Sequence, residues 1–430
     1  MSQSAVWELV EPYLVNSGFY KIPDPTYGRY SLPPHPPHRI LVDDTNVSHK
    51  YRRVFLRPFS SFADKHEAFD TTQVIHAEDV NLTEDEIYRG LQLGGRWICY
   101  STWELKAEPD GGWEGNGKGL GKDIILAHGL GDYGLRYTPH VHHFLKAGFR
   151  VIIPDLPSAS THFYGRSTGV HSYLPSFILL PAALHVVLTD VVQQDLLRGK
   201  DQRKVFLCGA SMGGWTVLYY LLKYPPSSSA TEVAARASQP DCPLPEEGDG
   251  TGYDRLERLR KDEKVRIDIA GAFVICPMVE VSKESRPSKF LEYIGRAISF
   301  IAGPLPFVQG VRGNVSDDPR VEEDFDSDPL CYHGLLRIGT GLAAVQAMTE
   351  LEKRASEIDI PIRLIHGNKD RATSHLGTLK LFDRLPNADK EIQIYDGYEH
   401  VMMKVGIDAA DDEKRQRVLA DWRNWLLQRC

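Results

Sequence analysis

Lys204-Val-Phe-Leu-Cys-Gly-Ala-Ser-Met-Gly-Gly214 is the stretch of sequence that decides the fold. Its apolar part, Val205–Leu207, has the length of a buried strand. The part that follows, Gly209–Gly213, has the G-x-S-x-G pattern of a sharp turn between a strand and a helix. Glycine is needed there because the turn leaves no room for a Cβ atom beside the neighbouring backbone. The apolar segment Trp215–Lys223 then predicts a helix whose N-terminus points to Ser211.

Strands and helices alternate on both sides of this turn. A chance match is the alternative to a functional serine, but the strand before it and the helix after it favour the functional interpretation. The expected strands are 96–103, 123–128, 149–154, 205–207, 269–276, 361–367 and 391–395, the first of them at a sheet edge. The expected helices are 137–147, 182–198, 215–223 and 411–428. The alternation predicts an α/β fold with a mostly parallel sheet flanked by helices.

Composition narrows the class of protein. The chain has 430 residues, a net charge of −8 and 42% hydrophobic residues, as in globular proteins. The negative charge disfavours a nucleic-acid partner. The first ten residues lack the basic start and apolar core of a secretion signal, and the six cysteines are scattered without metal-site spacing. We therefore expect a cytoplasmic protein.

Breaks in the pattern suggest the domain organisation. Residues 1–87 are expected to form an N-terminal extension that packs on the core, with a strand-like piece at Arg53–Leu56. The core is expected at 88–279 and 336–430, interrupted by a partly disordered surface insertion at 226–264. Residues 280–335 are expected to form a helical cap. Its apolar residues recur at helical spacing between Phe290 and Ile301, which fits either packing on the cap's own core or lining a substrate entrance.

The order of polar residues downstream of Ser211 suggests nucleophilic catalysis. A serine needs a base that takes its proton, and the base needs an acid that orients it. Asp370 follows the strand expected at 361–367, and His400 follows the strand expected at 391–395. Because the carboxyl ends of parallel strands meet at one edge of a sheet, the loops that carry these residues converge. We expect Ser211 to be the nucleophile, His400 the base and Asp370 its partner.

Other aspartates and histidines are alternative candidates for these roles. Asp396 is close to His400 in the sequence, and Asp359 precedes its strand and would lie at the wrong end. His366 is expected to be a packed core histidine. His140, His142 and His143 lie on an early helix without the spacing of a metal site, so no metal is expected.

The attacked carbonyl oxygen becomes negatively charged and needs two N–H donors. One is expected from Met212, directly after the nucleophile. The other is expected from Leu130, in the His128-Gly-Leu-Gly131 turn that follows an early strand. His128 is expected to hold that turn. Together these two N–H groups would form the oxyanion hole.

Taken together, these segments resemble the α/β-hydrolase superfamily, and within it the monoacylglycerol lipase branch, which is grouped with serine aminopeptidase-like hydrolases. The motifs that carry the resemblance are His128-Gly-Leu-Gly131, Gly209–Gly214, His366-Gly-Asn-Lys-Asp370 and Tyr398-Glu-His-Val401. Asp326–Leu330 also resembles the segment that returns these lipases from the cap to the core. The resemblance implies the α/β-hydrolase fold with an inserted cap, and the same catalytic and oxyanion-hole residues.

The resemblance also implies an activity. A serine hydrolase of this kind cleaves carboxylic esters through an acyl-enzyme, with water as the second substrate, and the expected substrate is a monoacylglycerol or a related acyl ester. The alternatives are an esterase or amidase acting on a specialised metabolite or small peptide, and a non-catalytic binding protein on the same scaffold. No metal or organic cofactor is expected. Peripheral contact of the cap with membranes or lipid droplets is a further hypothesis.

Overall fold

The computed structural model describes most of the core of the chain. The described residues are 46–56, 74–76, 96–107, 121–156, 172–226 without 175 and 198, 267–285, 305–308 and 313–430 without 329, together with a few single residues near 10–18 and 295–303. The surface insertion expected at 226–264 lies outside this part of the chain after residue 226. The helix expected between Phe290 and Ile301 lies outside it too, apart from Gly295, Ala297 and Ile298, which are helical.

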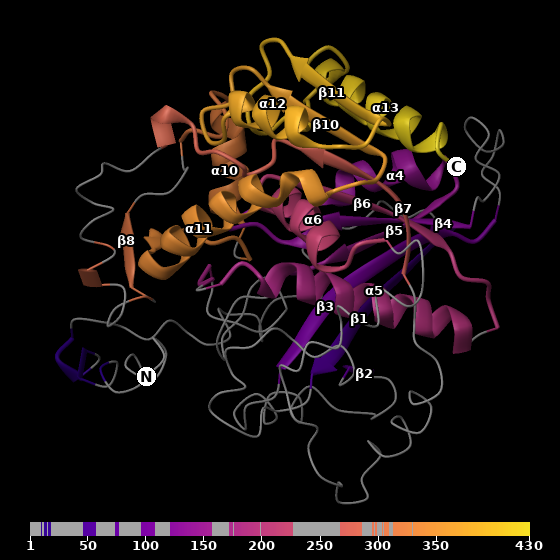
Figure 1. The fold of residues 1–430 in the computed structure, drawn as a ribbon, viewed down its shortest axis with the longest axis horizontal. Helices are drawn as coiled ribbons and strands as arrows, with labels where there is room; N and C mark the ends of the chain where they lie inside the picture. The colour runs from indigo at the N-terminus through magenta and orange to yellow at the C-terminus, as the bar shows by residue number, and fades with distance from the viewer. Residues whose placement is uncertain are drawn as a thin grey trace, which may run out of the picture.

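The fold is built on one sheet of nine strands, in the order β11-β10-β7-β6-β4-β5-β3-β1-β2 (Figure 1). The six parallel strands are β4 (Lys122–Ala127), β5 (Phe149–Pro154), β6 (Lys204–Ala210), β7 (Asp268–Ile275), β10 (Ile362–Gly367) and β11 (Lys390–Tyr395). Buried apolar residues dominate the central strands, as is typical of a parallel sheet covered on both faces. The expected mostly parallel sheet is confirmed.

Three antiparallel strands complete the sheet at one side. β3 (Arg96–Leu105) pairs with β5 on one side and with β1 (Val47–Leu56) on the other, and β2 (Val74–His76) pairs with β1. The expectation that 96–103 forms an edge strand was therefore wrong. Ten residues of β1 pair with β3 in continuous register, so a strand from the N-terminal segment covers that edge.

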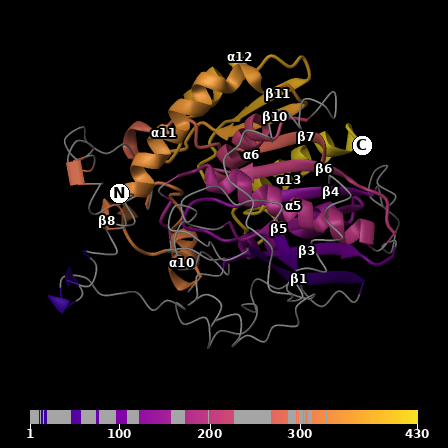
Figure 2. The same cartoon turned by 60° about the horizontal axis from the view of Figure 1, so that its bottom comes forward.

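Helices cover both faces of the sheet (Figures 1 and 2). On one face the buried side chains come from α5 (Leu179–Leu197), α6 (Met212–Lys223), α11 (Ile338–Arg354) and α12 (His375–Arg384). On the other face they come from α4 (Thr138–Leu145), which follows a short 3-10 helix, η4 (Gly134–Tyr137), and from α13 (Glu413–Leu427). Large aromatic side chains fill this second layer, with Phe273 stacked on Trp422 at 5.2 Å between ring centroids. Each face of the sheet thus has its own apolar core.

The segment between β7 and α11 contributes smaller elements. They are η5 (Lys283–Ser285), β8 (Pro306–Val308), α10 (Pro319–Ser327) and β9 (Leu336–Arg337), and a short antiparallel ladder joins β8 to β9. None of the residues in α10 is buried, so this helix lies on the surface of the molecule. Within the part of the chain that is described, no helix is long and apolar enough to cross a membrane.

The register of the parallel strands aligns their carboxyl ends. Ala210 of β6 pairs with Ile275 of β7, and Gly367 of β10 pairs with Tyr395 of β11. β7 and β10 are themselves paired, with Ile365 opposite Ile275. The loops that follow β6, β7, β10 and β11 therefore open side by side along one edge of the sheet, where ligands bind in open α/β sheets.

Candidate active site

Ser211 occupies a strained turn between β6 and α6. Its backbone has φ 56° and ψ −118°, a left-handed conformation that non-glycine residues rarely adopt. Three backbone hydrogen bonds hold it: its N–H donates to Ile275 O at 2.9 Å, and its carbonyl accepts from Trp215 N at 3.1 Å and from Met278 N at 3.0 Å. The turn matches the strand–turn–helix context expected for a nucleophilic serine.

Two glycines beside Ser211 are required by space. A Cβ atom on Gly209 would lie 2.3 Å from the carbonyl oxygen of Gly213. A Cβ atom on Gly213 would lie 2.0 Å from the carbonyl oxygen of Ala127, at the end of β4. Real Cβ atoms do not approach backbone oxygens this closely, so the tight contact between α6 and β4 depends on these glycines.

Asp370 lies in the loop after β10, and its carboxylate is almost fully buried. The Oδ1 atom accepts hydrogen bonds from the backbone N–H groups of Ala372 and Thr373, each at 2.8 Å. Burial alone would raise the pKa of this carboxyl, but His400 and His366 outweigh it and hold the pKa well below its usual range. Asp370 is therefore ionised at neutral pH.

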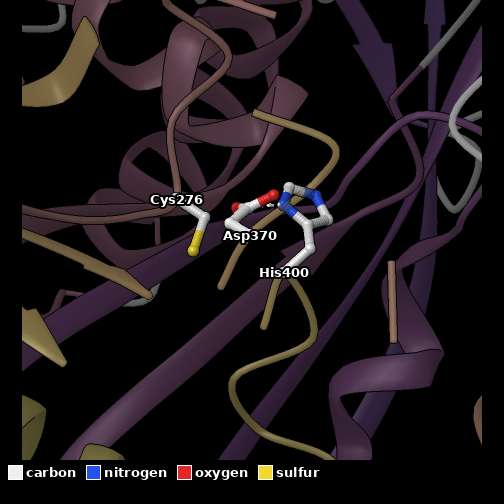
Figure 3. Close-up of side chains that lie close together, drawn as sticks. All are labelled: Cys276, Asp370 and His400. Atoms are coloured by element: carbon white, nitrogen blue, oxygen red, sulfur yellow. Dashed lines mark hydrogen bonds and ion pairs between the residues drawn. The ribbon is translucent and has the colours of Figure 1, made fainter. Parts of the chain in front are cut away.

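His400 lies in the loop after β11 and meets this carboxylate. Its Nδ1 atom is 2.7 Å from Asp370 Oδ2, which makes Nδ1–H the donor and leaves Nε2 as the other ring nitrogen (Figure 3). The two loops are tied together by Asn368, whose Oδ1 accepts from Gly397 N at 2.8 Å and whose Nδ2 donates to Asp396 Oδ1 at 2.7 Å. The structure thus brings Asp370 and His400 together as a hydrogen-bonded pair.

Ser211 and His400 are not hydrogen-bonded to each other. Among the residues that the structure describes, no hydrogen bond reaches the Ser211 hydroxyl. Catalytic hydrogen bonds are often long in an empty site and tighten when the substrate binds. Ser211 and the Asp370–His400 pair share the same edge of the sheet, on the loops after β6, β10 and β11.

The turn after β4 lies against Ser211. A Cβ atom on Gly129 would be 3.7 Å from Ser211 Cβ, so the peptide that joins Gly129 to Leu130 is next to the serine. Within the described part of the chain, no acceptor is bound to the backbone N–H of Leu130 or to that of Met212. Both N–H groups are thus available at the turn beside Ser211, and Met212 is also the first residue of α6.

His128 holds this turn from inside the protein. Its Nδ1 is 2.8 Å from Gly129 O, and its Nε2 accepts from the backbone N–H of Leu156 at 2.9 Å. Burial lowers the pKa of His128, so the ring is neutral with its proton on Nδ1. The expected structural role of His128 agrees with these contacts.

The residues considered as alternatives to Asp370 and His400 have other partners. Asp396 binds Asn368, and Asp359 accepts from Asn387 Nδ2 at 2.8 Å. His140 is buried on α4, where its Nδ1 lies 3.5 Å from an Arg415 nitrogen. None of these three residues contacts Asp370 in the described structure.

Sequence reasoning missed three residues around Asp370. His366, expected only to pack in the core, has Nε2 at 3.0 Å from Asp370 Oδ2, and Thr373 Oγ1 donates to the same oxygen at 3.0 Å. Thr378 in turn lies 2.8 Å from His366 Nδ1. The four-residue spacing of His366 and Asp370 around a tight turn is the one signal in the sequence that pointed to the first of these contacts.

Cys276 is a further titratable group near Asp370 and His400. Single ligand atoms of these three residues lie within 4.8 Å of one another, and Asp370 lies between the other two (Figure 3). Burial and the Asp370 carboxylate raise the pKa of the Cys276 thiol well above its usual value, so it stays protonated. Both Asp370 oxygens already accept hydrogen bonds. A protonated thiol and a satisfied carboxylate fit a proton-transfer site better than a metal site.

Glu399, next to His400, binds the segment that precedes α10. Its carboxylate accepts from Ser316 Oγ at 2.6 Å and from the backbone N–H of Asp317 at 2.7 Å. On the other loop, Arg371 forms an ion pair with Asp317 at 2.7 Å. The loops that carry Asp370 and His400 are therefore both fastened to the same stretch of the inserted segment.

One protein-family model matches most of the described core. The model for "Serine aminopeptidase, S33" matches residues 121–243 and 259–404, which include Ser211, Asp370 and His400.

Among characterised proteins, the chain is similar to a monoacylglycerol lipase from Mycolicibacterium smegmatis, with 23% identity over 337 residues, covering 78% of this chain and 94% of the relative. It is also similar to the caffeoylshikimate esterase of Arabidopsis thaliana, with 24% identity over 70% of this chain and 76% of the relative. Among solved structures, a soluble variant of the monoglyceride lipase of Saccharomyces cerevisiae superimposes with a TM-score of 0.55 at 18% identity, covering 78% of this chain and 92% of that one.

Proposed function

This chain belongs to the serine aminopeptidase family S33, in the monoacylglycerol lipase-like branch of the α/β-hydrolases, and we propose that it cleaves carboxylic esters through an acyl-enzyme on Ser211. The observation that carries the proposal is the 2.7 Å hydrogen bond from His400 Nδ1 to the buried carboxylate of Asp370, at the sheet edge where Ser211 stands in its strained turn. That pairing leaves Nε2 of His400 free to act as a base.

In the first half of the reaction, Ser211 Oγ attacks the ester carbonyl while His400 Nε2 takes the serine proton. Asp370 keeps the imidazole in the required tautomer and stabilises the imidazolium that forms. The negative charge that develops on the carbonyl oxygen is received by the N–H groups of Met212 and Leu130, which have no acceptor within the described structure. The proton on His400 then passes to the departing alcohol.

In the second half, a water molecule replaces the alcohol. His400 takes a proton from the water, which attacks the acyl-enzyme, and the same pair of N–H groups stabilises the second intermediate. Collapse of this intermediate returns the proton to Ser211 and releases the carboxylic acid. Every proton in this cycle is carried by His400, so the mechanism uses no metal ion or organic cofactor.

The proposed substrate is a monoacylglycerol or a related ester of a medium or long acyl chain. The similarity to the monoacylglycerol lipase of Mycolicibacterium smegmatis supports this choice. The second candidate is an ester of an aromatic acid, which the similarity to a caffeoylshikimate esterase supports at nearly the same identity. Hydrolysis of monoacylglycerols with acyl chains of 8 to 18 carbons should be compared with hydrolysis of short-chain and hydroxycinnamoyl esters, with Ser211→Ala as the blank. A preference for short or aromatic esters would contradict the lipase proposal.

The domain organisation proposed with this function keeps residues 280–335 as a cap and 1–87 as an extension. The contacts of Glu399 and Arg371 with Ser316 and Asp317 support a cap fastened beside the site.

We propose a cytoplasmic protein whose cap contacts a lipid surface. The buried thiols of Cys208 and Cys276 are consistent with a reducing compartment. Vesicle co-sedimentation with and without Ile298→Glu tests the lipid contact.

A further inference from the structure

His366, the penultimate residue of β10, shares a carboxylate oxygen with His400. Its Nε2 lies 3.0 Å from Asp370 Oδ2, the atom that His400 Nδ1 approaches at 2.7 Å. The His366 side chain is fully buried, whereas that of His400 is 10% exposed. One carboxylate oxygen is thus held by two imidazoles, one deep in the protein and one at the site.

The partners of His366 determine where its proton sits. Around Nε2 lie two acceptors, Asp370 Oδ2 at 3.0 Å and the carbonyl of Thr373 at 3.3 Å. Because both of these oxygens are acceptors, Nε2 must be the donor and therefore carries the proton. The hydroxyl of Thr378, 2.8 Å from Nδ1, is then the donor to the unprotonated nitrogen. A single chain of hydrogen bonds runs from Thr378 through His366 to Asp370.

We propose that His366 is a positioning residue for proton transfer, which donates from Nε2 to Asp370 Oδ2 and so holds this oxygen in line with His400 Nδ1. The inference rests on the proposed function, because it assigns His366 to the same site. His366 acts only through Asp370 and does not touch the reacting atoms.

The surroundings of His366 favour a permanently neutral ring. The titratable groups that face it are Asp370 in the loop after β10, His400 in the loop after β11, and His375, whose ring centroid is 6.3 Å away on α12. Cys276, the residue after β7, lies near Asp370. Burial lowers the pKa of His366, and the hydrogen bond to Asp370 opposes this effect only in part. A neutral imidazole donates one proton to the carboxylate without cancelling its charge, so the charge remains available to His400.

Loss of this donor has two consequences. Asp370 Oδ2 keeps its contacts with Thr373 and His400 but is aligned less firmly with His400 Nδ1, which lowers kcat by about 10- to 100-fold, the range set by one hydrogen bond to a charged group. The carboxylate also has one donor fewer, so it attracts the imidazolium of His400 more strongly. The midpoint of the acid limb of the kcat/KM profile therefore moves to higher pH. A residue that only fills space in the core would change stability and leave this midpoint in place.

The test compares His366→Leu, which removes the donor, with His366→Gln, whose amide N–H reaches a similar position. Profiles of kcat and kcat/KM against pH are measured with a p-nitrophenyl acyl ester on the full chain. The matched control is His375→Leu, since His375 lies close to His366 and donates nothing to Asp370. We expect the lower kcat and the raised midpoint in His366→Leu only, with His366→Gln and His375→Leu close to the native profile.

If His366→Leu does not fold, Thr378→Val provides the test instead. Valine has the shape of threonine but no hydroxyl, so the His366 ring loses the donor that fixes its orientation through Nδ1, and a shift of the midpoint in the same direction is expected. An unchanged profile and kcat in folded His366→Leu or Thr378→Val would overturn the inference. Labelling of native Ser211 by a fluorophosphonate separates the two levels: a labelled chain with unchanged variants rejects only the role of His366, whereas an unlabelled native chain rejects the proposed function itself.

Discussion

Glu399 Oε2 accepts a hydrogen bond of 2.6 Å from Ser316 Oγ, so the residue next to His400 holds the segment inserted between the core strands. A second hydrogen bond joins the other oxygen of Glu399 to the backbone N–H of Asp317. Because both bonds involve a charged carboxylate, each is stronger than a bond between neutral groups.

Glu399→Ala should release this segment. We expect hydrogen exchange in peptides that cover residues 313–318 to become at least about tenfold faster, since charge-assisted hydrogen bonds are worth about 1.5–3 kcal/mol. Glu352→Ala is the matched control, because Glu352 is exposed and pairs with Arg384 at 3.5 Å, on the surface and away from residues 313–318. Unchanged exchange in Glu399→Ala would mean that the segment is held by other contacts.

A buried ion cluster away from the candidate site gives a stability prediction. Arg150 donates to both oxygens of Asp123 and of Asp195, at 2.6 to 2.9 Å. Burial raises the pKa of Asp123, and Arg150 opposes this effect. Arg150→Leu removes the cation from the buried Asp195 and leaves Asp123 with the more distant Arg203, at 3.6 Å, and we expect it to lower the free energy of unfolding by about 3–5 kcal/mol.

The control for Arg150→Leu is Arg354→Leu. Arg354 pairs with Glu357 at 2.8 Å on the surface, where its side chain is 34% exposed. Such a pair contributes at most about 1 kcal/mol. Urea unfolding of both variants measures the difference, and equal losses would show that the buried cluster contributes no more than a surface pair.

His185 makes the stability of the fold depend on pH. Its ring stacks on Tyr224 at 3.9 Å between centroids, and its Nδ1 lies 2.9 Å from the hydroxyl of Tyr220. Burial, with a smaller effect of Lys223, lowers the pKa of His185 to about 4. A folded-state pKa below that of the unfolded chain means that the unfolded chain binds more protons between these values. The stabilisation is complete above about pH 6.5 and is lost as the pH falls towards 4.

We therefore expect the native chain to lose about 1–2 kcal/mol more free energy of unfolding than His185→Gln between pH 7 and pH 5. Urea denaturation at the two pH values measures this difference. His333→Gln, at an exposed position, should behave as the native chain does. Parallel losses in the native chain and His185→Gln would show that His185 is protonated in the folded state as readily as in the unfolded one.

Gly213 sets the distance between α6 and β4. Gly213→Ala would place its Cβ 2.0 Å from the carbonyl oxygen of Ala127, and we expect a loss of about 3 kcal/mol or more in the free energy of unfolding. Gly341→Ala on α11 is the control, because its nearest neighbour is the flexible end of Leu336 at 3.4 Å. That change should leave the stability unchanged or raise it by up to about 1 kcal/mol. Thermal melts of both variants measure the contrast.

Much of the fold was predictable because its signals are local. The strands around Ser211 are short apolar runs, and the turn at Gly209–Gly213 has a sequence pattern that its steric limits dictate. The position of β3 was not predictable from its own residues. Strand order depends on what pairs with an edge, and β1, which covers β3, lies 40 residues or more earlier in the chain.

In the candidate site, too, some residues were predictable from the sequence and others were not. The pairing of Asp370 with His400 was predictable because each follows a parallel strand, and the carboxyl ends of these strands meet at one edge of the sheet. His366 and Cys276 looked like ordinary core residues, since burial of a histidine or cysteine says nothing about which carboxylate it contacts. The contact of Glu399 with Ser316 links residues more than 80 positions apart and needed the tertiary structure.

The central claim is that Ser211 is a nucleophile activated by His400 and Asp370. Fluorophosphonate labelling of the native chain, compared with Ser211→Ala, His400→Ala and Asp370→Asn, tests it most directly, with Ser327→Ala on exposed α10 as the control serine. We predict rapid labelling of the native chain and of Ser327→Ala, none in Ser211→Ala, and rates lower by a factor on the order of 10³ in the other two variants. Failure of the folded native chain to label, or equal labelling of Ser211→Ala, would contradict the account.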